Sequence, residues 1–304
     1  MSLITEITND LRPIRRPAKI LYGGAAFWGV SAMVHVGALA LDGWRWSGAV
    51  SFRKPVVFSI SMALLLATVG WILDRLPDRP RLARTLAWAF LISSSIEVGL
   101  IAMQTWRGRA SHFNVLEAGD ALVFAGMGVA VGVISLCLIG TLVWSSIERP
   151  ADPLVRFAVI GGLALVTTGL GIGQWIIELG NEYVAANQAV PETVTYGFNG
   201  VAKFPHAVAF HGIQVFIVST VMMRLGGLDG SAQRLIFHVI FWSYTLILVF
   251  ASAQTVTGHA PSDLTPWSVG LLAGVGGVGV GLTKVISGLR ASTADDLEVS
   301  TPVA

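Results

Sequence analysis

The feature that most constrains this chain is a series of apolar segments, each long enough to cross a lipid bilayer. A helix that rises about 1.5 Å per residue needs about 20 apolar residues to span a hydrocarbon core roughly 30 Å thick. Such segments lie at about 20–41, 55–74, 85–104, 119–145, 154–177, 206–223, 235–255 and 267–288. The sequence therefore predicts an all-α integral membrane protein with about eight transmembrane helices.

The chain also carries too little charge for a soluble protein. Charged residues make up 12% of it, whereas an ordinary soluble domain has about 25%. The net charge is only +2, and no basic run with interleaved aromatic residues is present, so nucleic acid is not expected as a partner. The single cysteine, Cys137, excludes an internal disulfide, a cysteine-based zinc site and an iron–sulfur cluster. The partner that the composition requires is the lipid bilayer.

The distribution of basic residues predicts the orientation of the chain. Fourteen of the 20 lysines and arginines lie in the N-terminal segment, the C-terminal end and the loops at 75–84, 146–156 and 224–234. Because cytoplasmic loops carry the excess of Lys and Arg, both termini are predicted to be cytoplasmic, in the cytoplasmic (inner) membrane of a bacterium. The loops that follow residues 104 and 177 are then predicted to face outward.

Matches at an offset of 150 residues predict an internal duplication. The stretch "QTWRGRA" at Gln104–Ala110 corresponds to "QTVTGHA" at Gln254–Ala260, and the same offset pairs Arg84 with Arg234 at two helix starts. The alternative is chance matching between apolar sequences. A duplication predicts two four-helix halves, 1–150 and 151–290, related as a parallel repeat and followed by a disordered cytoplasmic tail at 291–304.

Polar residues of different spans are predicted to lie at one depth. His35 and Glu97, measured along their helices from cytoplasmic basic residues, and His211, measured from the outer helix start at Pro205, all fall in the outer half of the bilayer. Ionisable groups inside a membrane are costly and persist where they face a bundle interior or a water-filled cavity. The convergence predicts one polar cavity that opens toward the outer face.

Three sets of residues are candidates for chemistry in this cavity. The candidate catalytic residues are Glu97, His112, Arg107 and Arg109. The candidate substrate contacts are Lys54, Gln104, Asn114, Gln174, Glu178, Gln214 and Gln254. The candidate metal or haem ligands are His35, His206 and His211. Structural alternatives exist for some of these residues: His35 bonded to a neighbouring helix, Glu97 paired with Arg or His to hold the bundle together, and Arg107 and Arg109 in contact with lipid head groups.

Three stretches, "RKPVVFSIS", "IEVGLIAMQTWRGRASHFN" and "FPHAVAFHGIQ", carry a resemblance to a known family. They resemble bacterial multi-pass membrane proteins with Lys-Pro-x-x-Phe-x-x-Ser, Gln-x-x-Arg-Gly-x-x-Ser-His-Phe-Asn and His-x-x-x-x-His-x-x-Gln motifs. The resemblance covers most of the chain and implies a multi-pass fold, but no activity. The motif positions here are Lys54, Glu97, Gln104, Arg107, Ser111, His112, Asn114, His206, His211 and Gln214. The eight-helix arrangement is also similar to that of haem A synthase, whose own motifs are not recognisable here.

Three functions remain open at this point. The first is a membrane oxidoreductase-like protein whose pocket binds haem b or a metal ion, or acts on a lipophilic molecule such as a quinone. In that hypothesis Glu97 is a buried proton carrier. The second is a proton-coupled small transporter or channel, and the third is a non-catalytic subunit of a membrane complex.

Overall fold

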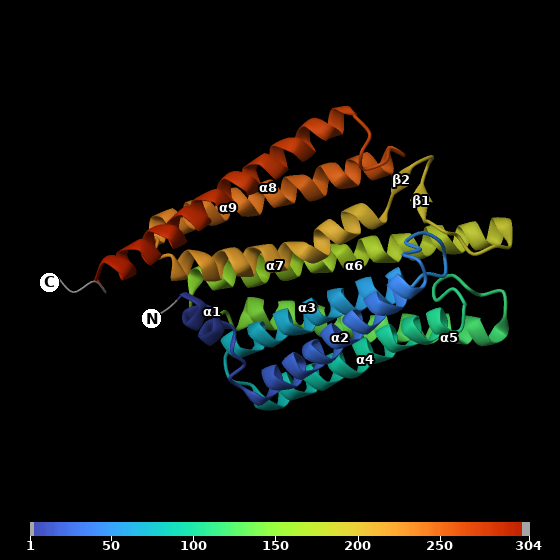
Figure 1. Ribbon diagram of the computed structural model, residues 1–304, viewed down its shortest axis with the longest axis horizontal. Helices are drawn as coiled ribbons and strands as arrows, with labels where there is room; N and C mark the ends of the chain where they lie inside the picture. The colour runs from blue at the N-terminus through green and yellow to red at the C-terminus, as the bar shows by residue number, and fades with distance from the viewer. Residues whose placement is uncertain (1–2, 300–304) are drawn as a thin grey trace. The chain divides into compact units, whose positions relative to one another are not determined.

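The structure is a computed structural model that describes residues 3–299, with the side chains of residues 5–290 (Figure 1). Its helices are α1 (Leu3–Leu11), α2 (Arg16–Leu41), α3 (Arg53–Arg75), α4 (Pro80–Trp106), α5 (Ala118–Ile147), α6 (Pro153–Asn187), α7 (Lys203–Leu225), α8 (Gly230–Val256) and α9 (Pro266–Val299). The strands β1 (Thr195–Tyr196) and β2 (Gly200–Val201) form a short hairpin. The predicted all-α multi-pass fold is confirmed, because α2 to α9 supply 8 helices long and apolar enough to cross a membrane.

The helix ends differ from the predicted spans in ways that the local sequence explains. Proline occupies an early position of α2 and α4, where its missing N–H costs nothing. Asp229 caps α8, since its carboxylate accepts hydrogen bonds from Ser231 and Ala232, and the bond from Ser231 lowers the pKa of that carboxyl group. The helix α6 is 35 residues long, about 52 Å, so it extends beyond a hydrocarbon core of about 30 Å.

The chain forms two compact units. The first, called here the α2–α5 unit, comprises Pro13–Trp144 and Leu170–Thr195; the second, called the α7–α9 unit, comprises the chain up to Arg12, Ser145–Gly169 and the chain from Tyr196. The helix α6 therefore gives its first half to one unit and its second half to the other. The division into halves 1–150 and 151–290 stays a prediction. Of the expected tail 291–304, the part up to Val299 continues α9, and residues 300–304 lie outside the described residues.

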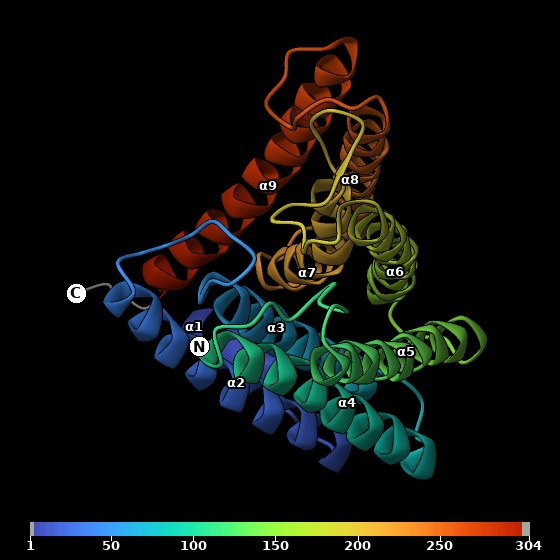
Figure 2. The ribbon, with the colours of Figure 1, turned by 90° about the vertical axis from the view of Figure 1, so that its right-hand side faces the viewer.

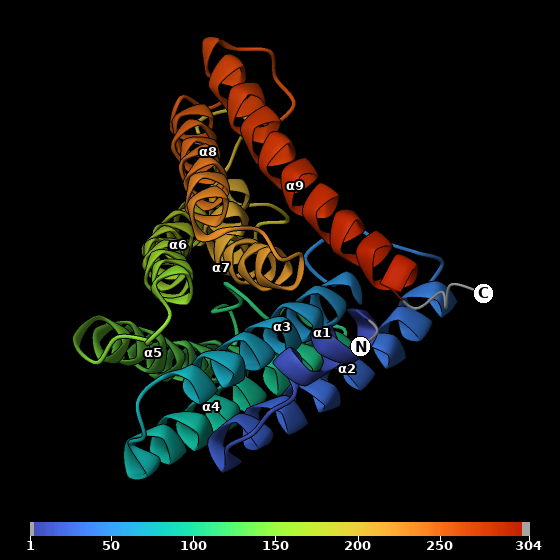
Figure 3. The same cartoon turned by 90° about the vertical axis from the view of Figure 1, so that its left-hand side faces the viewer.

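In the α2–α5 unit, the helices α2, α3 and α4 run side by side (Figure 3). Their shared core contains fully buried Leu21, Leu66 and Phe90, one from each helix. Gly24 permits the close approach of α2, because a Cβ at this position would lie 2.3 Å from Leu91 of α4. This packing fixes the relative height of α2, α3 and α4, and hence of the polar groups they carry.

In the α7–α9 unit, glycines allow α9 to lie directly against α8 (Figure 2). A Cβ on Gly270, Gly274, Gly277 or Gly281 of α9 would come within 2.1–2.6 Å of a side-chain atom on α8. The small-residue face of α9 is therefore used for helix packing inside the chain.

Two helix pairs correspond in length and position. The helices α3 and α7 begin at Arg53 and Lys203 and end at Arg75 and Leu225, each pair of ends lying 150 residues apart. The helices α4 and α8 show the same offset at both of their ends. This correspondence agrees with the internal duplication, which stays a prediction.

Candidate functional site

The candidate site of the α2–α5 unit is built around the loop 107–117, which joins α4 to α5. The helix α4 stops at Trp106 because Gly108 adopts a left-handed backbone, with φ of 67°, and the N–H of Arg109 bonds back to the Gln104 carbonyl at 2.9 Å. We call the end of the unit that carries this loop the loop end.

A buried carboxylate at the start of α5, that of Asp120, holds this loop. Its two oxygens accept hydrogen bonds from Gln104 Nε2 and Asn114 Nδ2, each at 2.9 Å. Both amides also lie near the carbonyl oxygen of Ala110, at 3.5 Å and 3.4 Å respectively. We call Gln104, Asn114 and Asp120 the Asp120 cluster. All three are buried, with at most 7% of their surface exposed.

The two arginines of the loop complete the charge balance of the Asp120 cluster. Arg107 donates to Gln104 Oε1 at 2.7 Å and lies 3.6 Å from Asp120. Arg109 donates to Glu117 Oε1 at 2.5 Å and lies 3.7 Å from Asp120. The hydrogen bond to Glu117 raises the pKa of the Arg109 guanidinium. Both arginines thus already have acidic partners inside the protein, although about half of each side chain stays exposed.

This network lets the loop turn back into the bundle. Glu97 lies seven residues before Gln104 on α4, about 10 Å along the helix axis, yet His112 of the loop reaches it. Irregular backbone at membrane depth is tolerated only where its polar groups are satisfied within the protein. The Asp120 cluster supplies those hydrogen bonds, which explains why so many polar residues follow an apolar helix.

The pair that the loop creates is Glu97 and His112. Glu97 is 3% exposed, its Oε1 lies 4.0 Å from His112 Nε2, and its Oε2 has no hydrogen-bond partner among the described residues. Ser111 Oγ lies 2.9 Å from His112 Nδ1. When that hydroxyl donates to Nδ1, the imidazole proton sits on Nε2, facing the carboxyl group.

Aromatic rings surround the histidine of this pair. The His112 ring lies 5.5 Å from Phe58 and 6.1 Å from both Phe113 and Phe124, measured between ring centroids. About a fifth of the His112 side chain is exposed, whereas Glu97 is enclosed. Access to Glu97 from the loop end therefore leads past His112.

Phe113 has an unusual backbone that fixes the direction of His112. Its φ is 60°, a left-handed conformation that is strained for a bulky residue. The ring is held against Gly180 of α6, where a Cβ would lie 2.2 Å from Phe113 Cε1. Gly180 is thus the socket that keeps Phe113, and with it His112, in place.

Substituting Gly180 with alanine is expected to destabilise the protein by about 1–3 kcal/mol, because the new methyl group overlaps the Phe113 ring. The free energy of unfolding in detergent measures this effect. Gly171→Ala on the same helix is the matched control: a Cβ there meets nothing within 4 Å, and alanine is the better helix former by about 0.5–1 kcal/mol. Equal stabilities of the two variants would contradict the socket.

His35 lies in the same unit but in a separate contact. Its Nδ1 lies 2.8 Å from the Ser31 carbonyl oxygen, and its Nε2 accepts the Trp106 indole N–H at 3.2 Å. A neutral imidazole that donates from Nδ1 and accepts at Nε2 has both nitrogens in use. A ligand role for His35 requires the Trp106 bond to open. In this arrangement His35 joins α2 to the end of α4.

The other two candidate ligands are on α7, in the α7–α9 unit. His206 Nδ1 lies 2.9 Å from the Gly169 carbonyl oxygen of α6, and its ring lies 4.7 Å from that of Phe210. His211 is exposed. The Gln214 amide nitrogen points to the carbonyl oxygens of Phe210 and His211, at 3.0 Å and 3.2 Å. Among residues 5–290, no group of three His, Cys, Asp or Glu side chains is arranged to hold a metal ion.

Gln254 occupies the position that corresponds to Gln104 and closes a similar turn. Its Nε2 donates to the carbonyl oxygens of Ala260 at 2.7 Å and Asp263 at 2.8 Å, and its Oε1 accepts from Thr265 at 2.6 Å. Gly258 is left-handed, with φ of 78°, as Gly108 is. Every polar atom of the Gln254 amide is therefore engaged in holding the loop after α8.

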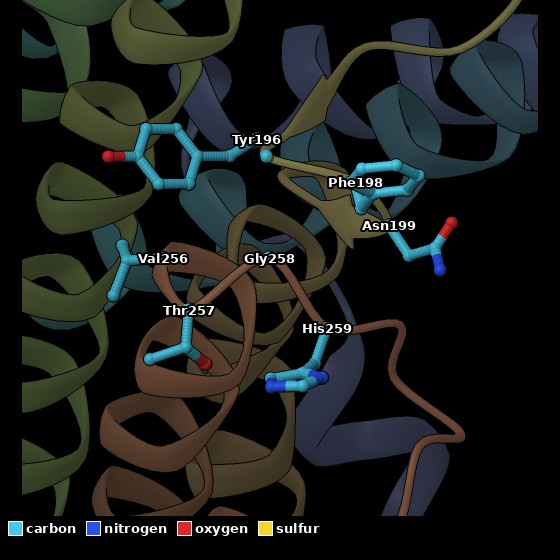
Figure 4. A pocket seen from close by; sticks show the side chains of 8 residues that line it. Tyr196, Phe198, Asn199, Val256, Thr257, Gly258 and His259 are labelled. Carbon is cyan, nitrogen blue, oxygen red and sulfur yellow. The ribbon is translucent and has the colours of Figure 1, made fainter.

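Beside this turn the β1–β2 hairpin leaves an open hollow of about 480 Å³ (Figure 4). Gly197 and Gly258 approach closely there, since a Cβ on Gly197 would lie 3.1 Å from the Gly258 Cα. Figure 4 shows Tyr196 and His259 on either side of Gly258. His259 lies 3.6 Å from Asp263, and the hollow contains none of the candidate residues of the cavity.

The remaining candidate substrate contacts lie on α3 and α6. Gln174 and Glu178 are exposed on α6, and Lys54 is half-buried at the start of α3. The structure thus brings together Glu97 with His112, and Gln104 with Arg107, Arg109 and Asn114, through Asp120.

Sequence reasoning did not identify Asp120, Phe113 or Gly180. A signal for Asp120 exists: two arginines beside an apolar span need an acidic partner, and Asp120 is the acid in the first turn of the next helix. No comparable signal marks Phe113 and Gly180, which meet only in the folded chain.

No protein-family model, no curated protein and no solved structure matches this chain.

Proposed function

We propose that this membrane protein performs acid–base chemistry on a small molecule that reaches the loop end, with Glu97 as the proton carrier and His112 as its exchange partner. The observation that carries the proposal is the enclosed Glu97 carboxyl group 4.0 Å from the partly exposed imidazole of His112. An ionised carboxylate buried without a counter-charge is costly, so the two groups are expected to change protonation together. By the distribution of basic residues, the loop end faces outward.

The polar residues deeper in the unit support a one-sided site. Beyond Glu97, the buried polar positions of α3, α4 and α5 are serines and threonines, among them Thr68, Ser93 and Thr141. Each of these three hydroxyls donates to a carbonyl oxygen three or four residues earlier on its own helix. Such hydroxyls offer no titratable relay toward the other end. This favours acid–base chemistry on a bound molecule over a proton path across the bilayer.

The α7–α9 unit lacks the pair. At the offset of 150, Ile247 stands where α4 has Glu97, and Ser262 stands where the loop has His112. The glutamine turn is present in both places, but an enclosed carboxyl group beside a histidine is present only after Gln104, because the pair of His259 and Asp263 in the second turn is exposed. This supports a scaffold role for Gln104 and a chemical role for Glu97 and His112.

A haem or metal in the site finds less support from the side chains present. Both nitrogens of His35 already have partners, and His206 contacts the Gly169 carbonyl oxygen. Proton transfer needs only the two residues that the structure does bring together. The proposed proton transfer therefore involves Glu97, His112 and the bound molecule alone.

The test is infrared difference spectroscopy of the protein in lipid nanodiscs during a pH titration. A carbonyl-stretch band of a protonated carboxyl group is expected in the wild-type protein and is expected to vanish in Glu97→Gln. In His112→Gln the band should persist with a changed titration midpoint, because the neighbouring charge is gone. Glu117→Gln, at an exposed acid, is the matched control and should keep the wild-type band. A spectrum of Glu97→Gln identical to that of the wild type would overturn the proposal.

A further inference from the structure

A second hollow, of about 470 Å³, lies beside the Glu97–His112 pair in the α2–α5 unit. Its lining residues are Val115, Leu116, Phe124, Asn181, Val184, Ala185 and Gln188. Small-molecule sites typically occupy about 300–1,000 Å³, so this volume suits a ligand of one or two rings.

One face of α6 contributes four of the residues that line the hollow. Asn181, Val184, Ala185 and Gln188 are spaced i, i+3, i+4 and i+7 on α6 and so share one side of that helix. This face begins one residue after Gly180, the socket of Phe113. The same contact that positions His112 therefore positions the hollow.

Phe124 connects the hollow to the proton pair. It lines the hollow, and its ring centroid lies 6.1 Å from that of His112 and 5.6 Å from that of Phe113. A ligand in the hollow is thus separated from the imidazole by a single aromatic ring.

The chemistry of the lining defines the ligand class. No lining residue is charged, and the walls contributed by Val115, Leu116, Phe124 and Val184 are apolar. The Asn181 side chain is exposed and makes no hydrogen bond to another described residue, so its amide can donate to a ligand oxygen. An anion or cation would lose its hydration here without a counter-charge.

We propose that this hollow binds an uncharged, lipophilic ring molecule that carries a carbonyl or hydroxyl group, with its oxygen toward Asn181 and its ring against Phe124. The inference rests on the proposed function in one respect: the bound molecule occupies the loop end, where His112 and Glu97 are proposed to exchange protons. The binding itself depends only on the lining residues.

The experiment is equilibrium dialysis of labelled 1,4-naphthoquinone, an uncharged dicarbonyl ring, against the full chain in nanodiscs. Empty nanodiscs correct for uptake by lipid, and naphthalene serves as the probe without carbonyl groups. The wild-type chain is expected to bind the quinone saturably. Ala185→Trp should weaken binding about tenfold or more by filling the hollow. Ala186→Trp is the matched control, because Ala186 is exposed on the same helix turn and does not line the hollow.

Asn181→Leu, which keeps the side-chain size, tests the amide. It is expected to weaken naphthoquinone binding about fivefold and to leave naphthalene binding unchanged. Non-saturable uptake by the wild type, or equal binding by Ala185→Trp and the wild type, would overturn the inference. Glu97 does not line the hollow, so different variants test binding and proton exchange. If the infrared band persists in Glu97→Gln while Ala185→Trp still weakens naphthoquinone binding, the proton-carrier role of Glu97 is rejected and the binding site in the hollow is retained.

Discussion

Replacing Asp120 with alanine is expected to release loop 107–117 and to lower the Tm by on the order of 5–10 °C. The substitution removes the acceptor of the Gln104 and Asn114 amides and the acid that lies 3.6 Å and 3.7 Å from Arg107 and Arg109. Buried amide donors without their acceptor, and an Arg107 without its acidic partner, no longer support irregular backbone inside the bundle, although Arg109 keeps Glu117. The measurements are thermal unfolding in detergent and limited cleavage by trypsin after Arg107 and Arg109.

Two further variants separate the charge of Asp120 from its shape. Asp120→Asn keeps one acceptor oxygen and should lie between alanine and the wild type in both measurements. Glu117→Gln alters the exposed partner of Arg109 and should leave the Tm within about 2 °C. If Asp120→Ala unfolds at the wild-type temperature and resists trypsin equally, the Asp120 cluster does not hold the loop.

Substituting Gln254 with leucine is expected to destabilise the α7–α9 unit by about 1–3 kcal/mol. Leucine fits the fully buried position but leaves the Thr265 hydroxyl without its acceptor. It also removes one of two donors from each of two carbonyl oxygens: that of Ala260 keeps the Asp263 N–H, and that of Asp263 keeps the Ser268 hydroxyl. A buried polar group left unsatisfied costs about 1–3 kcal/mol. The free energy of unfolding measures the loss, and Gln174→Leu, at an exposed glutamine of α6, should change it by less than about 0.5 kcal/mol.

The same substitution at Gln104 separates the structural role that both glutamines share from the effect of the first turn on Glu97 and His112. Gln104→Leu should destabilise the protein to a similar extent and also shift the infrared band of Glu97, because it frees the loop that carries His112. Gln254→Leu should leave that band unchanged. A band that responds equally to both substitutions would refute the assignment of the proton pair to the α2–α5 unit.

The membrane architecture was predictable because it depends on local composition. Each apolar span is recognisable by its length, and the ends at Pro80 and Trp106 differ from the predicted span 85–104 by only a few residues. The grouping of Gln104, Arg107, Arg109 and Asn114 was also predictable, since they follow one another at a single helix end. In the structure these four side chains contact Asp120, and Arg107 also donates to Gln104.

Glu97 pairs with His112 only because the loop 107–117 turns back toward α4. An estimate of depth along a single helix cannot predict such a turn. Counting residues along α4 places the loop above Glu97, whereas the Asp120 cluster turns the loop back toward it. Trp106 shows the same limit. An exposed aromatic residue at a helix end is typical of the membrane interface, and Trp106 is 60% exposed, yet its N–H is bonded to His35. Side-chain partners across helices are set by packing.

The two glutamine turns give this protein an internal reference. The turns after Gln104 and Gln254 share a glutamine amide, a left-handed glycine and a bond to the carbonyl oxygen six residues on. The first turn leads to the enclosed Glu97 beside His112, whereas the second carries the exposed pair of His259 and Asp263. A change of lipid, detergent or temperature acts on both turns of the same molecule. A difference between their responses to pH then compares an enclosed histidine–carboxyl pair with an exposed one.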